Sequence, residues 1–273
     1  MKLFLHKLLL PGCLAVIFAS CHKNHTPDAG GSTLDKVVSQ YSNQQQNIKT
    51  TVQYQYDGSQ RLVLVTGSSS QTTSIDSTKF TYDANGRLSQ FVISSGSNGI
   101  ARYNIVYDGN GKMLRAVGTP ILQNLAVDDY TFAWDAQGRL ATDSSISGLG
   151  QHLYLYHKYT YDAANNIIQA EQYDNPYPGG SWQFSGKQTA TYDGHSNPLY
   201  SNALPLFVAA QCGEWWLLSA ANRGSVTSVG ASSTINDSYA NSYYTNSMIW
   251  RVNSSSSAAN SYPISYEYFY KAP

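Results

Sequence analysis

The sequence has little charge and little glutamate. Only 12% of its 273 residues are charged, and the formal net charge is zero. A nucleic-acid-binding protein needs a surplus of lysine and arginine to neutralise phosphates, so this composition argues against a nucleic-acid partner. Glutamate occurs only at Glu171, Glu214 and Glu267, which leaves few candidates for acid–base catalysis. Hydrophobic residues still make up 42% of the chain, enough to bury a core.

The sequence also lacks an apolar run long enough to span a membrane as a helix. The N-terminal run, Leu8–Phe18, has about eleven residues and follows Lys2 and Lys7, which is typical of a secretory signal. The four residues "FASC" that end at Cys21 resemble a bacterial lipobox. That resemblance implies that residues 1–20 form a lipoprotein signal peptide and that Cys21 carries the lipid. An ordinary secretory signal with an incidental Cys21 is the alternative.

Residues 21–33 are rich in proline, glycine and polar side chains, and they predict a flexible tether. The expected location is therefore the cell envelope, as an outer-membrane lipoprotein on the periplasmic or the outer surface. The membrane would be a partner through the N-terminal lipid. His22 and His25 lie in this tether, but two histidines without a third ligand do not indicate a metal site.

Cysteine is too scarce for a disulfide framework. If Cys21 is acylated, Cys212 is the one cysteine that remains after processing, so the domain depends on packing. A lone thiol in "AAQCGEWW" is more often a small buried apolar residue than a nucleophile.

A short motif recurs six times at spacings of 25–31 residues, which is the signature of a repeat architecture. The copies read "YDGSQRL" (56–62), "YDANGRL" (82–88), "YDGNGKML" (107–114), "WDAQGRL" (134–140), "YDAANNI" (161–167) and "YDGHSNPL" (192–199).

Each copy has the chemistry of a β-hairpin. An alternating, aromatic-rich segment precedes the aspartate, which predicts a strand. The aspartate opens the turn, because its short side chain accepts backbone N–H bonds two residues on. A glycine then closes the turn in the left-handed region. The predicted structural turn residues are Asp57, Asp83, Gly86, Asp108, Gly111, Asp135, Gly138, Asp162 and Asp193.

A calcium loop is the alternative reading of "DANG" and "DGNG". An EF-hand needs a bidentate glutamate six residues after its glycine and a helix on each side. Val92 and Val117 occupy the glutamate positions, so the sequence favours turns over metal sites. We expect no metal ion and no cofactor.

The motif Y-D-x-x-G-R-L resembles the YD repeat of Rhs-type bacterial proteins and teneurins, over about residues 50–200. The resemblance implies consecutive hairpins in one long sheet that spirals into a hollow shell. Six copies would give roughly twelve strands, enough for an open curved sheet or a partial barrel. The whole layout resembles bacterial lipoproteins of unknown function, which combine a lipobox, degenerate YD units and a tyrosine-rich C-terminal strand.

The fold class we predict is all-β and mainly antiparallel. A single domain over residues 34–273 would form one large curved sheet or partial barrel of consecutive hairpins. Its repeats cover about 50–200, and residues 201–273 complete the sheet less regularly. The apolar segment 204–222 predicts one short helix, with Pro205 in its first turn.

The function we expect is that of a membrane-anchored, non-catalytic structural or interaction module with a protein or glycan partner. The sequence contains no phosphate-binding glycine loop, nucleophile elbow or zinc motif. Surface glycan binding is the first alternative, because aromatic faces stack on sugars; its candidates are Tyr177, Trp182, Tyr239, Tyr243 and Tyr244. A small hydrolase is the second alternative.

Overall fold

The computed structural model describes residues 33–42, 47–123, 127–146, 154–175, 180–209, 215–230, 233–243, 248–258 and 261–271. The strands of this part of the chain are β1 (Thr33–Ser42), β2 (Asn47–Tyr56), β3 (Leu62–Ser69), β4 (Ile75–Tyr82), β5 (Leu88–Ser95), β6 (Asn98–Tyr107), β7 (Met113–Pro120), β8 (Asp129–Trp134), β9 (Leu140–Ile146), β10 (Tyr154–Tyr161), β11 (Ile167–Asn175), β12 (Gln183–Ser196), β13 (Ala221–Gly230), β14 (Thr234–Tyr243), β15 (Ile249–Ser256) and β16 (Ile264–Lys271). Two 3₁₀-helices, η2 (Tyr200–Asn202) and η3 (Trp215–Leu218), flank the helix α1 (Ala203–Ala209).

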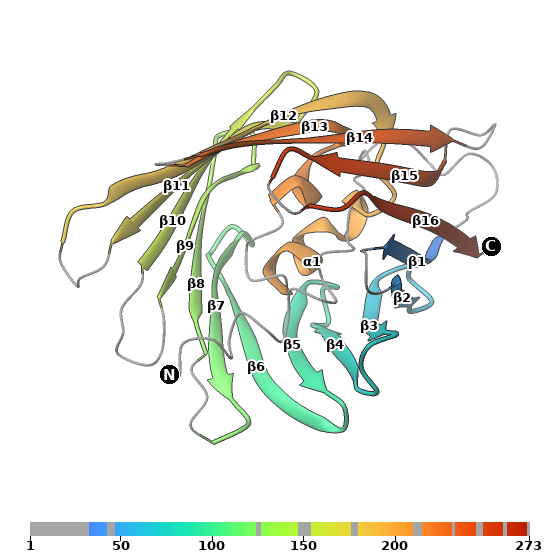
Figure 1. Ribbon diagram of the computed structural model, residues 1–273. Helices are drawn as coiled ribbons and strands as arrows, with labels where there is room; N and C mark the ends of the chain where they lie inside the picture. The colour runs from blue at the N-terminus through green and yellow to red at the C-terminus, as the bar shows by residue number, and fades with distance from the viewer. Residues whose placement is uncertain are drawn as a thin grey trace.

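The sixteen described strands form one antiparallel sheet that closes into a barrel (Figure 1). Each strand pairs with its neighbours in chain order, and β1 pairs with β16 to close the ring. The predicted all-β antiparallel fold with one short helix is confirmed. The sheet goes further than a partial barrel, because β1 and β14–β16 supply strands that the motif count does not include.

Side chains alternate between the inside and the outside of the barrel, as a strand's two-residue period requires. In β2, for example, Val52 and Tyr54 point inward and are each 1% exposed, whereas Gln53 and Gln55 point outward and are exposed. Closure leaves the sheet without a free edge, which removes the site at which strands of other molecules would add.

One end of the interior is filled by η2, α1 and η3, which follow β12 and which we call the plug (Figure 1). Leu206, Phe207 and Val208 of α1 are fully buried. Two polar bonds tie this plug to the strands: Asn202 Oδ1 accepts from the backbone N–H of Leu62, and Ser219 Oγ accepts from that of Ile167. No helix in the described residues is long and apolar enough to cross a membrane.

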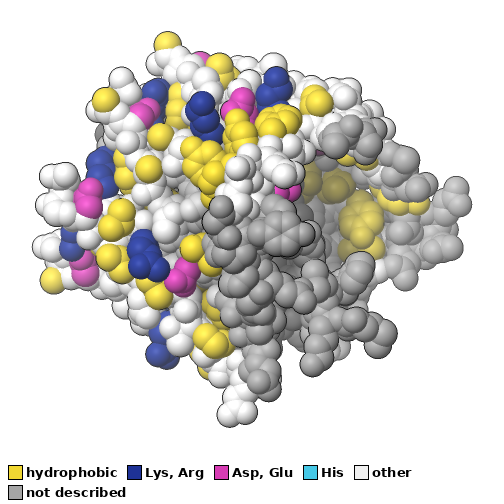
Figure 2. Space-filling model, turned by 90° about the vertical axis from the view of Figure 1, so that its left-hand side faces the viewer, with side chains coloured by type: hydrophobic (Ala, Val, Ile, Leu, Met, Phe, Trp, Pro, Cys, Tyr) yellow, Lys and Arg dark blue, Asp and Glu magenta, His cyan; other side chains and the backbone are white. Residues whose placement is uncertain are grey.

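The outer wall of the barrel is polar along its middle. The outward residues of β2 are Asn, Lys, Thr and Gln, and those of β14 are Thr, Asn, Ser and Ala. The exposed large hydrophobic side chains of the described strands lie within two residues of a strand end. Figure 2 shows one face, on which hydrophobic groups are small and interspersed with charged and other polar atoms.

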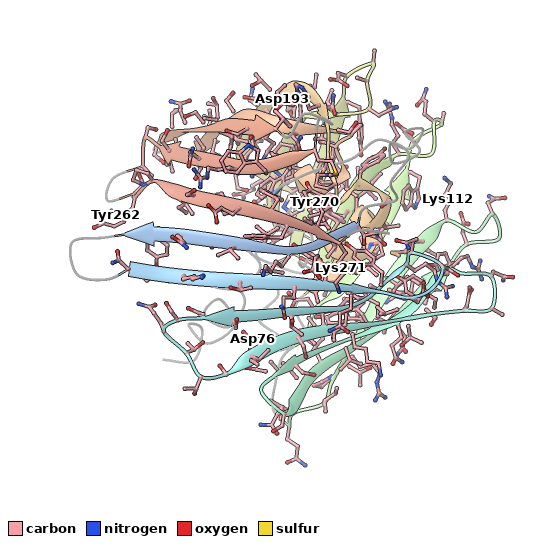
Figure 3. The ribbon with its side chains drawn as sticks, turned by 90° about the vertical axis from the view of Figure 1, so that its right-hand side faces the viewer. Asp76, Lys112, Asp193, Tyr262, Tyr270 and Lys271 are labelled. Carbon is pink, nitrogen blue, oxygen red and sulfur yellow. The ribbon has the colours of Figure 1, made fainter. Side chains whose placement is uncertain are left out.

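The two ends of the barrel differ. The five motif turns that join β2 to β3, β4 to β5, β6 to β7, β8 to β9 and β10 to β11 lie at one end, together with the start of β1 and the end of β16. We call this the repeat end. The opposite, or far, end carries the loops that join β3 to β4, β11 to β12 and β15 to β16. Figure 3 places Tyr262 and Asp76 at the far end and Lys112 toward the repeat end.

Replacing Gly86 by valine should lower the free energy of unfolding by roughly 1–3 kcal/mol, because Gly86 has φ of +77° and a β-branched residue adopts that region only under strain. Gly58, in another motif turn, has no Cβ clash and no positive φ, so Gly58→Val is the control and should change stability little. Chemical denaturation measures both. Equal losses in the two variants would contradict the assignment.

Candidate functional site

The motif aspartates organise the turns through their carboxylates. Asp83 Oδ1 accepts the backbone N–H groups of Asn85 and Arg87 at 2.9 and 2.8 Å, and Oδ2 accepts Arg87 Nε at 2.8 Å. Asp57 and Asp135 make the same three kinds of bond. Asp108 and Asp162 likewise each accept two backbone N–H groups.

These bonds favour the ionised carboxylate. The Arg61 side chain and backbone lower the pKa of Asp57, and the backbone N–H and side chain of Arg87 lower that of Asp83 against the opposing effect of desolvation. The carboxylate oxygens are thus used within the turn, in place of the ion coordination that a calcium loop requires.

The fourth residue of each of the five turns, counted from the aspartate, has a positive φ. Gly86, Gly111 and Gly138 have φ of +77°, +77° and +78°. In the other two turns Gln60 and Asn165 take this conformation, with φ of 60° and 66°. The turn geometry therefore persists where the glycine is absent.

Asp193 differs from the expectation. It lies inside β12, where the register shifts between Tyr192 and Ser196, and the chain does not reverse directly into a hairpin. The polypeptide instead runs through η2, α1 and η3 before β13. Asp193 Oδ2 accepts hydrogen bonds from Asn241 Nδ2 and from the Tyr243 hydroxyl, so this aspartate joins β12 to β14. The insertion of the plug at this point explains why the sixth turn opens.

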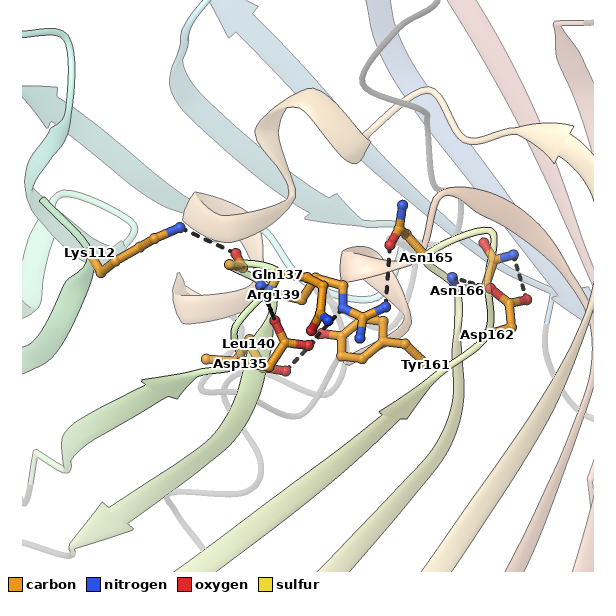
Figure 4. Close-up of polar contacts among 10 residues, drawn as sticks. Lys112, Asp135, Gln137, Arg139, Leu140, Tyr161, Asp162, Asn165 and Asn166 are labelled. Carbon is orange, nitrogen blue, oxygen red and sulfur yellow. Dashed lines mark hydrogen bonds and ion pairs between the residues drawn. The ribbon is translucent and has the colours of Figure 1, made fainter. Parts of the chain in front are cut away.

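Successive motifs also bind one another, which the sequence analysis did not foresee. Arg139 lies 4.5 Å from the ring centroid of Tyr161 in the next motif, and the Tyr161 hydroxyl donates to the Leu140 carbonyl at 2.8 Å (Figure 4). Arg139 also donates to Asn165 Oδ1, which links the two turns. We call this pair of contacts the motif interlock. The cation–ring contact and the hydroxyl–carbonyl bond that form the interlock use the first, sixth and seventh positions of the motif.

The interlock recurs around the repeat end. The hydroxyls of Tyr82, Tyr107, Tyr161 and Tyr192 and the indole N–H of Trp134 each donate to the carbonyl that ends the preceding turn, at 2.6–2.8 Å. The cations above four of these rings are Arg61, Arg87, Lys112 and Arg139, at 4.5–5.2 Å. The sequence alone does not indicate these contacts, because it contains no information on which ring lies beside each turn.

A second polar cluster lies inside the barrel on β9, β10 and β11. Asp143 is 2% exposed; its Oδ1 lies 2.9 Å from His157 Nδ1, and its Oδ2 accepts the Tyr159 hydroxyl. Burial disfavours the charged imidazole, but the hydrogen bond and charge of Asp143, with Gln172 and Asp174, outweigh it and raise the pKa of His157. The cluster therefore favours the protonated form of His157. The sequence does not indicate this pair, because only the strand register places Asp143 opposite His157.

The five aromatic residues that the sequence suggested for sugar binding lie in different parts of the molecule and do not form one surface in the described residues. Tyr239 packs against the core beneath Arg223, and Tyr243 stacks on His195 with a 4.0 Å centroid separation. Trp182 is 43% exposed and contacts Tyr156. Tyr177 and Tyr244 lie outside the described residues, as do Cys21, the whole of residues 1–32, and Cys212. Among the described residues, no group of three or more His, Cys, Asp or Glu could hold a metal ion.

Two crystal structures share this architecture. A porin-like protein from Bacteroides uniformis aligns with a TM-score of 0.57 and 15% identity, over 87% of this chain and 98% of its own. A porin-like protein from Bacteroides vulgatus aligns with a TM-score of 0.51 and 11% identity, over 88% of this chain and 99% of its own. Identities this low show the fold alone. Neither a protein-family profile nor a curated protein matches the chain.

The assignment to YD-repeat shell proteins and their lipoprotein group is therefore wrong. The hairpins close into a sixteen-stranded barrel, where the resemblance implied a spiralling shell, and the barrel is shared with porin-like proteins. A structure of TcdB2-TccC3-Cdc42 aligns with a TM-score of 0.33 over 10% of its chain, too low to carry an argument. The motif determines the shape of each turn and its contacts with the next turn. These local contacts do not decide whether the whole sheet closes into a barrel.

Replacing Tyr107 by phenylalanine should lower the free energy of unfolding by about 0.5–1.5 kcal/mol, because the Leu88 carbonyl loses its 2.7 Å hydrogen bond. Tyr262, which is 42% exposed in a far-end loop, provides the matched control Tyr262→Phe and should leave stability unchanged. Urea denaturation of both variants tests the interlock. If the Tyr107→Phe protein is as stable as the wild type, the hydrogen bond of the interlock does not stabilise the fold.

The raised pKa of His157 predicts a pH-dependent stability difference between the wild type and His157→Gln. Because protonation is favoured in the folded state, this contribution is fully present below the ordinary pKa of about 6.5 and is lost as pH rises through the folded-state pKa. The wild type should therefore exceed the variant in Tm most at acidic pH, and the gap should narrow in alkaline buffer. Thermal melts across this range measure it, and a constant gap would contradict the prediction.

Proposed function

We propose that this protein is a non-catalytic component of the cell envelope, anchored by lipid on Cys21, whose barrel is an interaction module in water. The observation that carries the proposal is the polar middle of the outer wall. A barrel that spans a bilayer presents an apolar band of about 25 Å to lipid. The outward Ser, Thr, Asn, Gln and Lys side chains of strands such as β2 and β14 instead suit an aqueous surrounding.

The interior supports the same proposal. A sixteen-stranded barrel is wide enough for an aqueous channel. In this barrel the buried helix α1 occupies the repeat end, and its plug is hydrogen-bonded to the strands through Asn202 and Ser219. A filled interior of this kind favours a stable scaffold over a pore.

Because the wall does not suit the bilayer, attachment to a membrane needs another part of the chain. The sequence provides the apolar run Leu8–Phe18 and the lipobox-like residues before Cys21. Acyl chains on this cysteine would hold the protein firmly, since each buried methylene contributes about 0.8 kcal/mol. Thr33 begins β1 at the repeat end, so that end is the nearer one to the lipid along the chain.

The geometry of the buried Asp143–His157 pair also supports a non-catalytic role. Asp143 and His157 are the best acid–base pair in the described residues, but no Ser, Thr or Cys side chain described here hydrogen-bonds to His157. The second oxygen of Asp143 is taken by Tyr159. A nucleophile activated by a base needs such a bond, so the cluster fits a structural role inside the lumen better than a hydrolase.

Metabolic labelling with an alkyne fatty acid in a Gram-negative host tests the anchor. The wild type should be labelled and should sediment with membranes, whereas Cys21→Ala should be neither labelled nor membrane-bound. Cys13→Ala is the matched control, because Cys13 lies in the same apolar segment, and it should behave as the wild type. An unlabelled wild type, or a labelled Cys21→Ala protein, would refute the lipid anchor.

A further inference from the structure

An aromatic row crosses the outer wall near the far end. Tyr156 pairs with Tyr173, and Tyr173 pairs with Phe184, so the three rings lie side by side on β10, β11 and β12. Trp182, just before β12, adds a fourth ring. The centroid separations are 5.7 Å from Tyr156 to Tyr173, 5.7 Å from Tyr173 to Phe184 and 5.5 Å from Tyr156 to Trp182.

The rings of this aromatic row reach solvent. Phe184 is 57% exposed, the highest value for a large hydrophobic residue in the described part of the chain, and Trp182 is 43% exposed. Strand pairing holds the backbones of Tyr156, Tyr173 and Phe184, and Asn175 Nδ2 donates to the Gly180 carbonyl just before β12. Exposed rings on paired strands form a stacking surface, because little backbone entropy is lost when a ligand binds.

A charged row lies directly beside the rings. Lys158 pairs with Glu171, and Glu171 pairs with Lys187, one outward position along the same three strands. Both oxygens of Glu171 already accept hydrogen bonds, from Gln169 Nε2 and the Tyr173 hydroxyl. Neither lysine forms an ion pair with a described residue. The row therefore presents two ammonium groups and one satisfied carboxylate.

We propose that the aromatic row and the charged row together bind an acidic glycan, a chain of sugars that carry carboxylates. The C–H face of a pyranose ring stacks on the negative face of an aromatic ring. The ammonium groups of Lys158 and Lys187 complement the sugar carboxylates. This inference rests on the proposed function, of which it specifies the partner.

The size of the surface favours a glycan over a protein. Three strands and two side-chain rows cover on the order of 200 Å² from the strand spacing. A stable protein partner needs about 800 Å² on each side. The rows also lie near the far end, away from the start of β1 at Thr33, so a lipid anchor on Cys21 would leave them accessible.

Affinity electrophoresis and calorimetry on the purified full chain, with oligogalacturonate as the acidic probe and a neutral β-glucan oligomer as the comparison, test the proposal. The wild type should bind the acidic probe and lose affinity as salt is raised, because screening weakens the lysine contacts. Trp182→Ala and Phe184→Ala should each weaken binding at least tenfold. The Lys158→Gln, Lys187→Gln double variant should weaken it several-fold and abolish the salt dependence.

The matched controls are an exposed ring and an exposed lysine that lie outside the aromatic and charged rows. Tyr262→Ala removes an exposed ring, and Lys79→Gln removes an exposed outward charge on β4, so both should bind as the wild type does. Absence of binding, equal binding by Trp182→Ala, or a preference for the neutral probe would overturn the inference. A labelled, membrane-bound protein that fails to bind would reject the glycan alone and leave the proposed function standing.

Discussion

The repeat end of the barrel depends on a hydrogen bond that five of the six motif aromatics donate to a backbone carbonyl of the preceding motif. Strands of neighbouring hairpins share backbone bonds along their length, but the pairing of β3 with β4 ends at Leu64 and Lys79, before the turns are reached. The hydroxyl of Tyr82, for example, reaches the Leu62 carbonyl at that point, and the Arg61 guanidinium covers the ring. The aromatic side chain thus joins two neighbouring hairpins beyond the last residues that their strands pair.

This arrangement explains why the motif contains an aromatic residue, an aspartate and an arginine at fixed positions. The aspartate shapes its own turn and also binds the arginine of that turn, as in the 2.7 Å contact between Asp135 and Arg139. The arginine, held by one partner, then lies over the ring of the next motif. Because one side chain serves both the turn and the neighbour, the turn and the lateral contact form together.

Much of the fold follows from local chemistry that the sequence displays. The two-residue alternation, the turn aspartates and the apolar segment near residue 204 predict strands, reversals and a helix, and all three are present. Closure could not be predicted, because it depends on β1 meeting β16 across more than two hundred residues. The hydrogen bond of Asp193 to Tyr243 on β14 could not be predicted either, because the two residues are 50 positions apart in the sequence.

The candidate sites were harder to predict than the fold for the same reason. The Asp143–His157 pair and the row from Tyr156 to Phe184 come from neighbouring strands, so they emerge only when the register is known. Of the four rings in the aromatic row, Trp182 is the one that the sequence analysis named as a candidate for sugar binding. Composition identifies the residue types on a wall, but only the pairing of strands shows which of them are adjacent.

The seam between β1 and β16 has a consequence for biogenesis. The first and last strands of the described chain are mutual neighbours, so the ring stays open until the final strand has left the ribosome or the translocon. Until then the nascent sheet carries two unpaired edges, each able to capture another strand. This single pairing closes the ring and removes both edges, and among the described strand pairs it joins the two that are furthest apart in the sequence.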